Sequence, residues 1–109
     1  MARRLDPDDY VEAVLSIVEQ VPPGMVTTYG LIAVAIGQGG PRQVGAVMAG
    51  YGGPVPWWRV VRADGSLPPS HDHRAHQEYL GEGTPLRPSG AVDLKKAVWI
   101  PSDIHRPLP

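Results

Sequence analysis

The sequence contains no cysteine among its 109 residues. A chain without thiols forms no disulfide, builds no cysteine-based zinc site and offers no cysteine nucleophile. The sequence also lacks an apolar run of about 18 residues, which a membrane-spanning helix requires, so we expect no membrane contact. No apolar stretch follows the basic residues Arg3 and Arg4. We therefore expect no signal peptide and a cytoplasmic protein.

Glycine and proline, which interrupt secondary structure, are abundant, with 13 of each. They are dispersed between periodic segments, and this indicates turns and short elements instead of disorder. Hydrophobic residues make up 42% of the chain, enough for one modest core. The length predicts a single domain over residues 1–109.

The net charge is only -1, but the charges are unevenly placed. The first nineteen residues contain the acids Asp6, Asp8, Asp9, Glu12 and Glu19. Between positions 20 and 63 there is no acid, whereas Arg42, Arg59 and Arg62 are present. This distribution predicts one positive face for a polyanion, unless the clustering is a chance feature of a segment rich in glycine and proline.

A first helix is predicted after Asp6, a good N-cap, with Pro7 at the first helical position. Apolar side chains then recur at helical spacing, at Tyr10, Val11, Val14, Leu15 and Val18. The segment 22–24 ends this helix, and residues 25–27 are expected to be extended.

Two further helices form a candidate helix-turn-helix. Thr28 can cap a second helix and Gly37 can end it. Pro41 can open a third helix, which we expect to run from 42 to about 49 and to stop at Gly50. The connection between the two helices is short and rich in glycine, as in a helix-turn-helix motif.

The third helix carries unusually small residues, Gly45 and Ala46. Glycine inside a helix costs about 1 kcal/mol relative to alanine, so its presence needs a packing or functional reason. Two reasons are open at this point: close packing on another helix, or close approach to a nucleic-acid groove.

The segment 57–62 has strand character, and residues 63–66 carry a hairpin turn signal around Asp64 and Gly65. A hairpin after a helix-turn-helix is a wing. Two adjacent tryptophans in a strand point to opposite faces. One of Trp57 and Trp58 would then belong to the core, and the other would line a surface or pocket or be incidental.

The remaining elements are a fourth helix over 72–80, closed by Gly81 and Gly83, and a tail over 91–99 that can cover a core. Residues 101–109 are expected to be frayed. The expected fold is therefore mainly α with a small β wing, a winged helix-turn-helix.

A group of polar residues at the start of the fourth helix suggests a metal site, through His71, Asp72, His73 and His76. Such a run at a helix start is more often a solvated surface, and we expect no metal there. No phosphate-binding loop fits the segment 37–40, which lacks a lysine. We expect no cofactor.

Three stretches of sequence occur in a fixed order and together span roughly residues 7 to 83. They are Val21-Pro22-x-Gly24-x-Val26-x-x-Tyr29-Gly30-x-Ile32-Ala33, then Arg42-x-Val44-Gly45-x-x-Met48, then Val55-Pro56-Trp57-Trp58-Arg59-Val60-Val61. In combination they resemble the DNA-binding domain of the O6-alkylguanine-DNA alkyltransferases. The resemblance implies a winged helix-turn-helix DNA-binding domain.

In that family the active-site sequence is Pro-Cys-His-Arg-Val, and Trp57 stands at the position of its cysteine. Tryptophan there marks the alkyltransferase-like proteins, which are non-enzymatic relatives. Composition agrees, because alkyl transfer to a protein needs a thiolate and this chain has no thiol. We therefore expect no enzymatic activity.

The chain departs from the family pattern beside this position. Trp58 stands where the family has histidine, and Glu78 resembles the glutamate that completes its relay, here as a structural remnant. The lid over the base pocket corresponds to residues 65–70. The family's hinge asparagine is not recognisable around residues 50–52.

The resemblance implies that an O6-alkylguanine is flipped out of double-stranded DNA, with the third helix in the minor groove. The implied DNA-binding residues are Thr28, Tyr29, Arg42, Gln43, Gly45 and Ala46. Tyr29 would press on the target phosphate, and Arg42 would fill the gap that the base leaves. The implied lesion pocket consists of Tyr29, Pro56, Trp57, Trp58 and Arg59, in which Arg59 braces the wing.

The resemblance further implies that nucleotide excision repair proteins are partners and that bound protein is associated with the nucleoid. We expect a monomer. Two other functions stay open: a winged-helix regulator without lesion specificity, and a protein-interaction module that uses Trp57 or Trp58 as an anchor.

Overall fold

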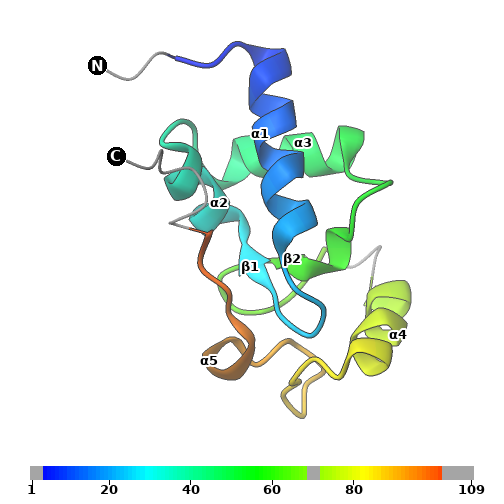
Figure 1. The fold of residues 1–109 in the computed structure, drawn as a ribbon. Coiled ribbons are helices and arrows are strands. Elements are labelled where there is room, and N and C mark those ends of the chain that lie inside the picture. Colours follow the sequence, from blue (N-terminus) through cyan, green and yellow to red (C-terminus); the bar gives the residue numbers. More distant parts are fainter. Residues whose placement is uncertain (1–3, 69–71, 102–109) are drawn as a thin grey trace.

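The computed structural model describes residues 4–68 and 72–101, which form a mainly helical fold with one small sheet (Figure 1). This confirms the predicted fold class. In chain order the elements are α1 (Pro7–Gln20), β1 (Thr27–Thr28), α2 (Tyr29–Ile36), α3 (Pro41–Tyr51), the 3-10 turn η1 (Trp57–Arg59), β2 (Val60–Val61), α4 (Asp72–Glu82) and α5 (Leu94–Ala97).

Helix α1 begins and ends where its sequence predicts. The Asp6 carboxylate accepts a hydrogen bond from the Asp9 backbone N–H at 2.9 Å, and Pro7 is the first helical residue. The apolar stripe faces inward, with Tyr10, Val14, Ile17 and Val18 buried. The helix therefore supplies one side of the main core.

The helix-turn-helix consists of α2 and α3. Thr28 Oγ1 accepts a hydrogen bond from the Leu31 N–H at 3.0 Å and so caps α2, and Gly37 ends it in the left-handed conformation with φ 80°. Helix α3 does not stop at Gly50, as predicted, but continues to Tyr51. Buried contacts of the α3 side chains Val44 and Val47 outweigh the weak helix propensity of one glycine.

The small sheet differs from the predicted hairpin. Its strands β1 and β2 pair in parallel, with Thr27 opposite Val60 and Thr28 opposite Val61. The predicted turn does form, because the Arg62 N–H bonds the Ser66 carbonyl at 2.8 Å. Among the described residues, no antiparallel strand pairing continues beyond this turn. Proline follows at position 68 and has no backbone N–H to donate to a neighbouring strand.

The tryptophans belong to a turn and not to a strand. Residues 57–59 form η1, in which the Arg59 N–H donates to the Pro56 carbonyl at 3.0 Å. Trp57 and Trp58 therefore do not alternate across a sheet. Proline at 54 and 56 restricts the preceding backbone, and side-chain contacts from α4, described below, hold the turn in place.

Two hydrophobic clusters lie on either side of β2. Val60 belongs to the cluster of α1, α2 and α3, whereas Val61 belongs to a second cluster with α4 and the tail. The tail covers the core as predicted: Val92 and Ala97 are buried, and Trp99 packs on the first cluster.

The ends of the last elements differ slightly from the predicted ones. Helix α4 runs through Gly81 to Glu82, and Gly83, with φ 73°, follows it. Pro101 is buried instead of frayed, and residues 102–109 lie outside the described part. In residues 4–68 and 72–101, none of the helices has the length and apolar character needed to span a membrane.

Candidate nucleic-acid interface

A cavity of about 450 Å³ opens between α2, α3 and the start of α4. It is lined by Tyr29, Gly45, Met48, Ala49, Gly52, Gly53, Trp57, Leu67, Pro68 and Arg74. The lining is mostly small or apolar, with a phenol, an indole and one guanidinium, and the volume lies in the range of small-ligand sites. A flat aromatic ring with a small substituent fits this description.

The structure brings together three of the predicted site residues at this cavity: Tyr29, Gly45 and Trp57. It places Leu67 and Pro68 of the predicted lid on the same lining. Met48, Ala49 and Arg74 were not among the predicted residues. Arg74 belongs to the run 71–76, in which the histidines are the more conspicuous side chains.

The outer surface of α3 is open, with two long polar side chains at its start and small residues after them. Arg42, Gln43 and Ala46 are exposed, and a Cβ added at Gly45 would meet nothing within 4 Å. Close helix packing therefore does not explain Gly45. The open surface favours the alternative that α3 approaches an external ligand, with Arg42 at its N-terminal end.

Gln43 and Thr28 have structural tasks at the helix ends. The Gln43 side-chain oxygen accepts a hydrogen bond from the Gly40 N–H at 2.7 Å, and Thr28 caps α2 as described above. Both residues remain beside the open surface of the helix-turn-helix. Their side-chain acceptors are already engaged in the protein.

Tyr29 is held as a neutral phenol. Burial raises its pKa above the ordinary value, and the nearby positive charge of Arg62 offsets only part of that rise. A neutral phenol can donate a hydrogen bond to an acceptor such as a phosphate oxygen. Arg62, which is exposed, adds a positive charge near the cavity, and the sequence had indicated it only through the uneven charge distribution.

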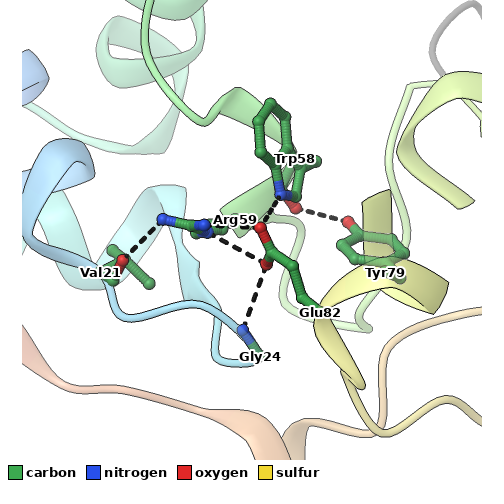
Figure 2. A network of polar contacts seen from close by, with 6 residues as sticks. All are labelled: Val21, Gly24, Trp58, Arg59, Tyr79 and Glu82. Atoms are coloured by element: carbon green, nitrogen blue, oxygen red, sulfur yellow. Dashed lines mark hydrogen bonds and ion pairs between the residues drawn. The ribbon is translucent and has the colours of Figure 1, made fainter. Parts of the chain in front are cut away.

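The predicted pocket residues Pro56, Trp58 and Arg59 lie outside the cavity lining. Trp58 and Arg59 face a part-buried carboxylate instead (Figure 2). Glu82 accepts from Arg59 Nε at 3.1 Å, from Arg59 Nη2 at 2.5 Å, from Trp58 Nε1 at 3.1 Å and from the Gly24 N–H at 3.1 Å. Arg59 also donates to the Val21 carbonyl at 3.0 Å. We call this set of contacts the Glu82 network.

The acid beside Trp58 is therefore Glu82, and the identification of Glu78 with the family's relay glutamate was wrong. Glu78 is half-buried on α4 and takes no part in the Glu82 network. The two acids are four residues apart, one helical turn, so spacing alone could not separate them. The Arg59 side chain joins the end of α1 to α4, and its charge is paired with Glu82 instead of facing solvent.

The Glu82 network holds the ring of Trp58, Tyr79 holds its backbone, and Trp58 in turn contacts Trp57. The Tyr79 hydroxyl donates to the Trp58 carbonyl at 2.5 Å, and the Arg59 guanidinium lies 5.6 Å from the centre of the Trp58 ring. The Trp57 and Trp58 rings meet edge to face, with centroids 5.6 Å apart. The Trp57 indole, which lines the cavity, therefore packs against a ring that the Glu82 network holds in place.

A second cavity, of about 790 Å³, lies between α4 and the segments 64–67 and 87–91. His73 and His76 line it and are exposed, whereas His71 lies outside the described residues. In the described part of the chain, no group of three or more His, Cys, Asp or Glu residues is placed to hold a metal ion.

The sequence matches the family described as 6-O-methylguanine DNA methyltransferase, DNA binding domain, over residues 9–83. A DNA base-flipping protein of Escherichia coli (strain K12) is 38% identical over 97 residues, covering 84% of this chain and 75% of that protein. A DNA base-flipping protein of Vibrio parahaemolyticus is 32% identical over 99 residues, covering 86% of this chain and 99% of that protein.

Two solved structures share the fold. One is S. pombe Atl1 in complex with damaged DNA containing O6-carboxymethylguanine, with a TM-score of 0.78 and 27% sequence identity, covering 89% of this chain and 100% of that chain. The other is S. pombe ATL in complex with DNA, with a TM-score of 0.76 and 28% identity over the same shares of the two chains.

Proposed function

Because the chain belongs to the family of 6-O-methylguanine DNA methyltransferase DNA-binding domains, as an alkyltransferase-like protein, we propose that it recognises O6-alkylguanine in double-stranded DNA by base flipping. Helix α3 enters the minor groove, and the damaged base enters the 450 Å³ cavity beside it. The observation that carries this proposal is the cavity itself, which is lined by an indole and opens next to the exposed surface of α3.

The proposal gives each site residue a role that is compatible with its place in the structure. Tyr29 lies at the cavity as a neutral phenol and presses on the phosphate of the flipped nucleotide. Arg42, exposed at the start of α3, fills the space in the base stack. Trp57 presents an apolar surface to the alkyl group, and Arg74 supplies one positive charge at the cavity lining.

The free energy that base flipping costs is similar in size to the free energy that contacts in the cavity return. Extruding a base costs a few kcal/mol, and less where its pairing is already damaged. Contact of one base with an aromatic side chain returns about 1–3 kcal/mol. The acid-free segment 20–63 offers few arginines for nonspecific contacts, so the selectivity for damage comes from the cavity.

The protein performs no chemistry on the lesion. The chain has no cysteine, and Trp57 takes the place of the family's nucleophile. The persistent complex flags the lesion for nucleotide excision repair proteins. We propose that the protein acts as a monomeric single domain and is associated with the nucleoid in the cytoplasm when it is bound to DNA.

We expect selective binding without reaction. A labelled duplex with one O6-methylguanine should be competed by lesion duplex at lower concentration than by the matched undamaged duplex. After long incubation, mass spectrometry should find the protein mass unchanged and the lesion intact. A protein heavier by one methyl group would contradict the non-enzymatic assignment, and equal competition by both duplexes would favour a regulator without lesion specificity.

Arg42→Ala should weaken binding of the lesion duplex by about 1–3 kcal/mol, the range for one lost stacking-type contact. Arg42 is exposed, so the variant should stay folded by circular dichroism. Arg87→Ala, at another exposed arginine outside α3, serves as the matched control. Equal affinities of the folded Arg42→Ala protein and the wild type would remove Arg42 from the site.

A further inference from the structure

Helix α3 has a hollow on each of its two flanks. With 3.6 residues per turn, Gly45 and Met48 lie on one flank, which lines the 450 Å³ cavity. Gln43 and Val47 lie on the opposite flank, which lines a separate groove of about 440 Å³. The proposed function uses the first hollow and leaves the second without a role.

The segment before α1 forms the far side of this second groove, which Arg4 and Leu5 line. The side chain of Gln38, in the turn between α2 and α3, holds the Leu5 backbone at both of its polar groups. Gln38 Oε1 accepts from the Leu5 N–H at 2.7 Å, and Gln38 Nε2 donates to the Leu5 carbonyl at 3.1 Å. These bonds span 33 residues of sequence and hold the backbone next to Arg4 beside the helix-turn-helix.

The turn between α2 and α3, which contains Gln38, is held in place by a side chain of α1. The Tyr10 hydroxyl donates to the Gln38 carbonyl at 3.0 Å, and Tyr10 is buried. A Cβ at Gly39 would lie 2.6 Å from the Tyr10 hydroxyl, so no larger residue fits there without a shift. The Leu5 backbone, which directly follows Arg4, is therefore fixed relative to α3 by side-chain contacts.

A helix in the minor groove has one sugar-phosphate backbone along each flank. The groove of B-DNA is about 6 Å wide and a helix with side chains about 10–12 Å, so both strands press against the sides of α3. If the damaged strand delivers its base to the 450 Å³ cavity, the undamaged strand runs along the other flank. This step rests on the proposed function.

We propose that Arg4 binds a backbone phosphate of the undamaged strand, as an N-terminal arm fixed by Gln38. A guanidinium matches a phosphate in charge and in hydrogen-bonding geometry. The exposed acids Asp6, Asp8 and Asp9 follow directly in the sequence and would repel a phosphate. Arg4 offsets this repulsion on the side of the segment that faces α3.

The first test compares Arg4→Gln with wild type on duplexes with and without one O6-methylguanine. We expect Kd to rise by the same factor for both, roughly 3- to 10-fold, and the slope of log K against log salt to fall in magnitude by about 0.9. Lys96→Gln removes the same charge on α5, at the other end of the molecule from α3 (Figure 1), and should change neither. An unchanged Kd and salt slope for Arg4→Gln would overturn the proposal.

The second test identifies the strand. Uncharged methylphosphonates are placed singly on either strand of the lesion duplex. One position on the undamaged strand should weaken wild type but not Arg4→Gln, whereas positions on the damaged strand should weaken both proteins equally. Coupling of Arg4 to the damaged strand alone would refute the assignment.

A third comparison tests whether Gln38 acts through Arg4. Gln38→Ala should reproduce the loss of affinity of Arg4→Gln, and the double variant should be no weaker than Arg4→Gln alone. Additive losses would show that Gln38 does not act through Arg4. If wild type does not prefer the lesion, the proposed function fails, but the salt slope of Arg4→Gln on undamaged DNA still decides whether Arg4 binds a phosphate.

Discussion

Replacing Glu82 with alanine is expected to lower the free energy of unfolding by about 3 kcal/mol, near the lower end for removing one partner of a buried ion pair. The Arg59 and Glu82 side chains are only 14% and 13% exposed. Without the carboxylate, the Arg59 charge loses its counter-ion, and the Trp58 and Gly24 N–H groups lose their acceptor. Urea denaturation followed by circular dichroism measures the loss.

Two variants on the same helix control this experiment. Glu78→Ala removes an acid outside the Glu82 network and should change stability by less than about 0.5 kcal/mol. Glu82→Gln retains an acceptor oxygen and should lose less than Glu82→Ala. Equal losses in Glu78→Ala and Glu82→Ala would contradict the assignment of Glu82 as the acid that joins α4 to the 3-10 turn.

The contribution of Glu82 should depend on pH. Burial alone would raise the pKa of Glu82, but the hydrogen bonds from Arg59, Gly24 and Trp58 and the charge of Arg59 outweigh it, so the net pKa is lowered. A lowered pKa in the folded state stabilises the protein above the unfolded pKa, about 4.3 for glutamate. The stability difference between wild type and Glu82→Gln should therefore persist at pH 6–8 and shrink as the pH falls below about 4.

Trp57→Ala is expected to abolish most of the preference for lesion DNA. The indole lines the cavity, and removing one base-stacking aromatic costs about 1–3 kcal/mol, or roughly 5- to 150-fold in affinity. Binding of undamaged duplex, which places no alkyl group in the cavity, should change much less. Competition binding with the matched duplexes measures the ratio, and an unchanged ratio would make Trp57 a packing residue only.

Fluorescence gives an independent readout of the same variant. Lesion DNA should change the emission of the wild type more than undamaged DNA does, because the base alters the polarity around the Trp57 indole. Trp57→Ala should lose most of this difference, because Trp57 lines the cavity whereas Trp58 and Trp99 are not among its lining residues. A lesion-dependent signal that survives in Trp57→Ala would have to come from Trp58 or Trp99.

Introducing a cysteine at position 57 should not make the protein an efficient alkyltransferase. Trp57→Cys supplies a nucleophile, but the ring N–H of Trp58 donates to Glu82 and cannot accept the thiol proton. The thiol should therefore keep a near-ordinary pKa and transfer alkyl groups inefficiently. Efficient methylation of Trp57→Cys, seen as added mass, would show that the chain contains a base that the Glu82 network does not provide.

The local elements could be predicted from the sequence because their signals are local. Asp6 with Pro7 and Thr28 with Gly37 define helix ends through contacts within three or four residues. The absence of cysteine by itself excludes a thiol nucleophile, whatever the fold. The motifs around Tyr29, Gly45 and Trp57 also identified the family. These three predicted site residues line one cavity.

The remaining features depend on contacts between segments far apart in sequence, which no local pattern encodes. The parallel pairing of Thr27 with Val60 replaced the expected hairpin, because strand register is decided by core packing and not by turn residues alone. The choice of Glu82 over Glu78 depends on which carboxylate meets Arg59, 23 residues away. The position of the Leu5 backbone, next to Arg4, depends on two hydrogen bonds with the Gln38 side chain. Side chains that act across the fold are assigned by tertiary structure, because their partners are neighbours only after the chain has folded.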